Sequence, residues 1–147
     1  MTARILTGDF LLGRGIEVYR WVEHTGELEL ALEATEEAEL FAAALAALAE
    51  LLDESSSGNP ARHEIALRSP ERATLLAHWL NELIILAETE DFVPETVTTL
   101  ELACDGLHAT VEGFRGRPPH LVKAVTYHEL EFGAEEGRVW ARAVLDV

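Results

Sequence analysis

The chain has 147 residues, a length typical of one domain, and hydrophobic residues make up 48% of it, which argues against intrinsic disorder. Eleven Lys and Arg stand against 27 Asp and Glu, a formal net charge of −16, which argues against direct nonspecific binding to nucleic acid. Cys104 is the single cysteine, so an internal disulfide is excluded and a cytoplasmic location is expected. No apolar run has the length of a membrane-spanning helix.

The first half of the chain predicts strands, a helix and a further strand. Residues 1–15 show no clean period and are expected to form a leading segment, with the folded domain over residues 16–147. Residues 16–23 and 27–33 alternate and are predicted strands. Apolar residues at helical spacing predict a helix over 36–52, and a short strand is expected over 62–68.

The second half predicts one more helix followed by strands. Ser69 as the N-cap and Pro70 in the first helical position predict a helix over 70–88, which would bury Trp79. Alternating segments separated by turn residues predict strands over 97–103, 108–114, 123–132 and 139–147. Antiparallel strands with two amphipathic helices indicate an α+β domain.

Few residues suggest chemistry. The sequence has no glycine-rich phosphate loop and no nucleophile elbow. His24 and His128 lie among polar residues near predicted strand ends, where a structural histidine is the more common finding. Glu27 follows a turn and Asp146 lies on the last strand, and together they could offer carboxylate oxygens to a hard divalent cation. The spacing alone does not bring these two acids together.

Four sequence blocks, in order and at matching spacing, resemble the archease family. The similarity covers about residues 16–147. The blocks are the turn EHTGE at 23–27, WLNEL at 79–83, KAVTYH at 123–128 with Leu130 and Glu131 after it, and the ending AVLDV at 143–147.

The resemblance implies a fold, a function and a partner. Archeases have a duplicated β-α-β-β motif, with antiparallel sheets wrapped around two helices. The family activates the GTP- and metal-dependent RNA ligase of tRNA splicing by promoting its guanylylation and turnover, and is not itself a catalyst. An RNA ligase protein is therefore the expected partner. A divalent metal is the expected cofactor, calcium in the first place, with manganese or magnesium as alternatives.

Carried onto this sequence, the metal ligands implied by the resemblance are Glu27, Asp146 and Val147. The family usually has His-Thr-Ala-Asp where this chain has His-Thr-Gly-Glu, so a longer acid stands at position 27. Residues that would face the partner or support the site are His24, Glu29, Glu82, Lys123, Tyr127 and His128. Two alternatives stay open, a modulator of a tRNA methyltransferase and a stand-alone metal-dependent hydrolase.

Overall fold

The computed structural model describes residues 5–12, 15–24, 27–52, 58–116, 122 and 124–146, with side chains except those of residues 5–18, 24, 127 and 128. The elements follow in the order β1 (Ile5–Leu12), β2 (Gly15–His24), β3 (Glu27–Ala34), α1 (Glu37–Leu52), β4 (Pro60–Arg68), α2 (Arg72–Thr89), β5 (Phe92–Ala103), β6 (Gly106–Arg115), β7 (Ala124–Glu135) and β8 (Arg138–Asp146).

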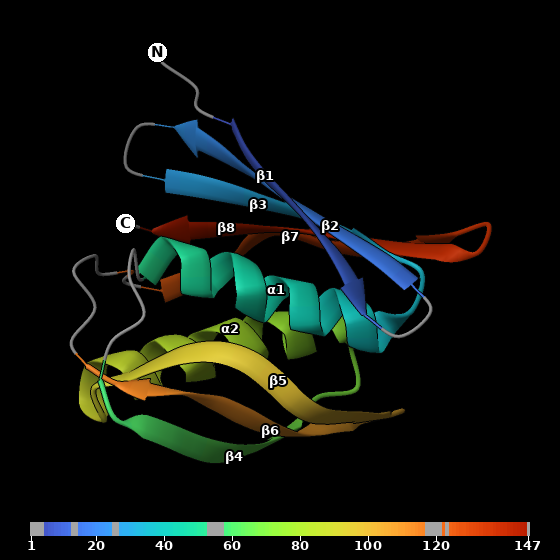
Figure 1. Ribbon diagram of the computed structural model, residues 1–147. Helices are drawn as coiled ribbons and strands as arrows, with labels where there is room; N and C mark the ends of the chain where they lie inside the picture. Colours follow the sequence, from blue (N-terminus) through green and yellow to red (C-terminus); the bar gives the residue numbers. More distant parts are fainter. Residues whose placement is uncertain are drawn as a thin grey trace.

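These elements form two antiparallel sheets with both helices between them (Figure 1). The five-stranded sheet has the order β1-β2-β3-β8-β7, and the three-stranded sheet has the order β4-β6-β5. Each sheet combines strands from both halves of the chain, since β8 pairs with β3 and β6 pairs with β4. The predicted α+β class, with antiparallel sheets around two helices, is confirmed.

One continuous core fills the space between the sheets. Alternation on β3 buries Leu28, Leu30 and Leu32 toward the helices and leaves Glu27, Glu29 and Glu33 on the outer face. The largest fully buried side chains include Trp21, Trp79, Tyr19, Phe41 and Phe92. Among the described residues, no helix combines the length and hydrophobicity needed to cross a membrane.

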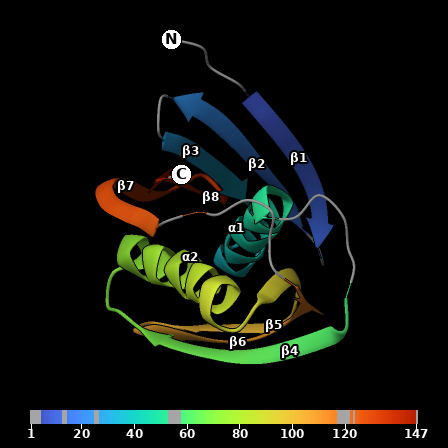
Figure 2. The ribbon, with the colours of Figure 1, turned by 90° about the vertical axis from the view of Figure 1, so that its left-hand side faces the viewer.

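The two helices differ in how much of their surface is covered. Helix α1 lies centrally and packs against β2, β3, β5 and α2 (Figure 2). Its alanines at 43, 44 and 47 are buried and allow close approach from several sides. Helix α2 lies to one side, against β7, β5 and α1, and leaves Ile85 48% exposed. Both helices were predicted within two residues of their observed ends.

One strand was missed, and another starts earlier than predicted. Residues 5–12, for which no element was predicted, form β1 and pair with β2. Apolar and polar residues do not alternate in the sequence ILTGDFLL, so the pattern did not predict a strand. Strand pairing through backbone groups requires no such alternation. Strand β5 begins at Phe92, five residues before its predicted start, because Phe92, Val93 and Pro94 are all buried and a register shift follows Pro94. Proline is tolerated there because β5 is an edge strand.

The predicted N-cap of α2 was wrong, although the helix starts only two residues after its predicted start. Glu71, in an extended conformation, precedes the first helical residue Arg72, so Ser69 is not the N-cap. The backbone N–H of Ser69 donates to the Asp105 carbonyl (2.9 Å), which holds Ser69 at the end of the β4–β6 pairing. Its hydroxyl instead accepts a local hydrogen bond from the Glu71 N–H (3.3 Å), as serine often does in turns.

Candidate functional site

The ends of four neighbouring strands bring two of the sequence-predicted ligands together. Glu27 on β3 and Asp146 on β8 are direct partners in the antiparallel register. Such pairs have Cβ atoms about 4.5–5.5 Å apart and side chains on the same face. Leu28 and Leu145, one position further along, are buried, so both acids project from the outer face of the five-stranded sheet.

The row of partners extends to both sides of this acid pair. His24 on β2 is the partner of Glu27, and Ala124 on β7 is the partner of Asp146. Strand β7 therefore begins beside Asp146, at the end of the sheet where the KAVTYH block lies. Lys123 and Val147 fall outside the described residues, as do the side chains of His24, Tyr127 and His128.

Two like charges on directly opposed residues repel each other, unless a cation or a proton lies between them. Glu27 is exposed and Asp146 is half-buried, so water surrounds this pair only in part. The described residues contain no group of three or more His, Cys, Asp or Glu that could hold a metal ion. A hard cation takes six or more oxygens, so this pair could supply only part of the coordination.

Glu29 is engaged elsewhere. It lies on the same outer face as Glu27, but the Arg142 Nε lies 3.7 Å from its carboxylate. Arg142 also lies 3.6 Å from Glu131 on β7, so its guanidinium bridges two neighbouring strands. Sequence reasoning missed Arg142, because the register that places it diagonally across from Glu29 depends on a pairing between distant segments.

Glu82 lies on α2, away from the acid pair. It lines a cavity of about 520 Å³ together with Ala124 and Val125, the first residues of β7. The neighbouring Asn81 makes two hydrogen bonds to Val125: its Oδ1 accepts from the backbone N–H (2.8 Å) and its Nδ2 donates to the carbonyl (3.4 Å). Asn81 therefore fixes the start of β7 next to Asp146, a role that the WLNEL block alone did not reveal.

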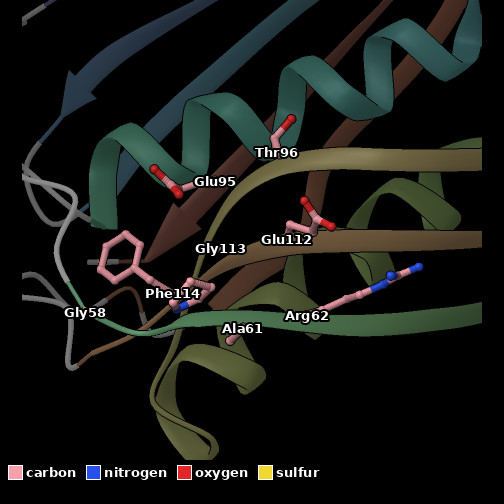
Figure 3. Close-up of a pocket in the computed structure, with 9 residues that line it drawn as sticks. Gly58, Ala61, Arg62, Glu95, Thr96, Glu112, Gly113 and Phe114 are labelled. Atoms are coloured by element: carbon pink, nitrogen blue, oxygen red, sulfur yellow. The ribbon is translucent and has the colours of Figure 1, made fainter.

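A separate cavity of about 520 Å³ lies on the three-stranded sheet. Figure 3 shows the Phe114 ring at one end and Arg62 extending at the other. Arg62 and Thr96 are the register partners of Glu112 from either side, so a cation, a carboxylate and a hydroxyl lie in one row. Of the sequence-predicted site residues that the structure describes, none lines this cavity, so we treat it separately from the candidate site.

Comparison with known proteins identifies relatives over most of the chain. The model of the archease protein family matches residues 19–147. A protein archease of Methanosarcina mazei is 30% identical over 139 residues, which cover 88% of this chain and 95% of that protein. One of Methanothermobacter thermautotrophicus is 32% identical over 119 residues, which cover 74% of this chain and 84% of that protein.

Two solved structures share the fold. The solution structure of a Methanobacterium thermoautotrophicum protein has a TM-score of 0.61 at 28% identity and covers 86% of this chain and 96% of its own. The crystal structure of a Thermotoga maritima archease, described as a possible chaperone, has a TM-score of 0.64. At 21% identity, with 85% of this chain and 94% of its own covered, it supports the fold alone.

Proposed function

Because the chain belongs to the archease family, we propose that it is a non-catalytic accessory protein that activates a GTP- and metal-dependent RNA ligase of tRNA splicing. In this proposal the protein promotes guanylylation of the ligase and its repeated turnover. The negative charge supports a protein partner with a basic surface, because complementary charges speed association and select the partner.

The observation that carries the proposal is the register pairing of Glu27 with Asp146. These are the two described positions to which the family resemblance assigns metal ligands. Their carboxylates fit a hard divalent cation in donor type, and a bound cation would relieve the repulsion between them. Calcium, manganese or magnesium would supply positive charge at this end of the sheet, while Glu27 and Asp146 would hold it beside the start of β7.

Glu27 differs from the family's usual Asp by one methylene group. Calcium accepts irregular geometry at about 2.3–2.6 Å from oxygen, so a longer arm on an exposed strand end can still reach the ion. Glu27→Asp should therefore keep the cation site. Glu27→Gln should weaken it, because the amide carries no charge.

The activity test combines the purified protein with an RNA ligase, GTP and manganese, and follows guanylylation of the ligase. The wild type should accelerate guanylylation, and Asp146→Asn should lose most of that effect. Glu101→Gln is the matched control, because Glu101 is exposed on the other sheet. A wild-type protein that leaves guanylylation unchanged would refute the ligase as the partner.

The metal is tested separately by thermal unfolding with added calcium or manganese. A ligand that binds only the folded state stabilises it by about 2.7 kcal/mol at a hundredfold excess over its Kd. The wild type should show a rise in Tm that Asp146→Asn lacks and Glu101→Gln retains. The cation site is refuted if Asp146→Asn shows the same rise as the wild type.

A further inference from the structure

The outward side of α2 is a surface that the fold leaves open. Figure 2 shows α2 beside α1, with β7 above it and β4 below, and no described helix or strand outside it. β7 and β4 are edge strands of different sheets, so neither sheet continues over the helix. Ile85 lies on this side and is the one large hydrophobic side chain that is exposed in the described part of the chain.

A groove of about 520 Å³ follows this side of the helix. Its apolar lining comes from three elements, namely Ile84 and Ile85 of α2, Leu67 of β4, and Ala124 and Val125 of β7. Glu82 and Glu88 stand one turn before and one turn after Ile85, and His78 and Asn81 complete the polar lining. No Lys or Arg among the described residues lines the groove. Neither carboxylate forms an ion pair with a described residue, and both border the apolar lining around Ile85.

The backbone of β7 beside the groove is already occupied. Asn81 binds both the N–H and the carbonyl of Val125, the groups that an added strand would need at this edge. Strand addition is therefore a disfavoured way for a partner segment to dock at Val125. Docking through side chains, as when an amphipathic helix lies in an apolar groove, requires no free backbone.

We propose that this groove binds a basic amphipathic helix of a partner protein. An apolar side chain of that helix packs against Ile85, and flanking Lys or Arg residues lie over Glu82 and Glu88. The inference rests on the proposed function, since it assigns the surface through which an accessory protein would hold its partner. This surface is distinct from the outer-face acid pair Glu27 and Asp146.

The direct test measures fluorescence anisotropy of a labelled helical peptide with leucines at helical spacing and lysines beside them. The wild-type protein should bind it, and a peptide with glutamates in place of the lysines should not bind. Ile85→Lys should weaken binding by about tenfold or more, because it removes the apolar contact and adds a like charge. Glu88→Lys should weaken it several-fold.

Glu101→Lys is the matched control for Glu88→Lys, because it makes the same charge change on the outer face of the three-stranded sheet. It should leave the Kd of the peptide within about twofold. Equal binding of the acidic peptide, or an unchanged Kd in Ile85→Lys, would overturn the inference. It would also be overturned if sedimentation showed a dimer of the wild type that Ile85→Lys dissociates, because a second copy would then occupy the groove.

The same variants separate this inference from the proposed function. If wild type and Ile85→Lys activate an RNA ligase equally, the groove inference fails and the proposed function stands. If the wild type does not activate the ligase but peptide binding depends on Ile85, the proposed function fails and the groove inference stands. A calcium-induced rise in Tm of Ile85→Lys equal to that of the wild type would show that the acid pair and the fold are intact.

Discussion

Asn81 takes the place that a neighbouring strand would occupy beside Val125. Its side-chain amide has the same donor and acceptor as a peptide group, so it satisfies both backbone groups of Val125 at the open edge of the sheet. The contact joins residues 44 apart in sequence and connects α2 to the strand that begins next to Asp146.

Asn81→Leu should destabilise the protein by about 1–3 kcal/mol, because the Val125 N–H and carbonyl lose their partners in a half-buried site. Chemical denaturation measures this loss. Thr89→Ala is the control, since the Thr89 hydroxyl donates to the Ile85 carbonyl on an exposed surface and its removal should cost less than about 0.5 kcal/mol. Equal losses in the two variants would contradict the role assigned to Asn81.

Trp79 joins the two helices. Its side chain is fully buried, its Nε1–H donates to the Phe41 carbonyl of α1 (2.9 Å), and its ring lies 6.5 Å from that of Phe41 between centroids. Trp79→Ala should cost roughly 3–5 kcal/mol of unfolding free energy. Trp140 on the outer face is half-buried, so Trp140→Ala should cost clearly less in the same denaturation experiment. A loss below about 1 kcal/mol for Trp79→Ala would contradict its place in the core.

At the scale of single residues, sequence periodicity identified the buried residues better than the site residues. The stripe through Trp79 predicted its burial, because a helix repeats along the chain and needs no knowledge of distant segments. The pairing of Glu27 with Asp146 depends on how the first and last parts of the chain meet. Only the family resemblance put these two residues in one site, since spacing carries no such information.

At the scale of whole elements, the strands were harder to predict than the helices. Both helices carry stripes that can be recognised locally, whereas β1 has no alternation and β5 starts in a run of three buried residues. The β7 strand contains a register shift between Thr126 and Glu131, which a strict alternation would not allow. Position in a sheet, and not local pattern, decides where such strands begin and bend.

Gly113 shows how closely β5 and β6 approach at the first of the β5 irregularities. A Cβ added to Gly113 would lie 2.0 Å from the Val93 carbonyl oxygen and 2.9 Å from the Pro94 Cα, both backbone atoms of β5. Gly113→Ala should therefore force the strands apart and cost at least about 1–3 kcal/mol. Differential scanning calorimetry should show a lower Tm.

Gly137→Asn is the matched glycine substitution. Gly137 has φ +77°, which Asn tolerates better than other residues, and an added Cβ meets nothing within 4 Å. Its cost should remain below about 1 kcal/mol. A Gly113→Ala protein as stable as Gly137→Asn would show that β5 can move away without loss.

Across the whole molecule, the excess of acids works against folding. A formal charge of −16 on a small domain repels itself, and salt weakens that repulsion. Raising NaCl from about 0.02 M to about 0.3 M should therefore raise the Tm, although ion pairs such as Arg138 with Glu33 (3.2 Å) lose strength. A Tm that falls over this range would mean that ion pairs outweigh the net repulsion.

The central place of β8 affects how the chain folds during synthesis. β8 lies between β3 and β7, yet on the order of 100 residues are translated after β3 before β8 emerges, which takes roughly 5–20 seconds at typical elongation rates. Throughout that time β3 carries an unpaired edge that invites pairing with other chains. A nascent chain that stops before Arg138 would keep that edge open, so incomplete products should aggregate or be degraded while full-length chains close the sheet.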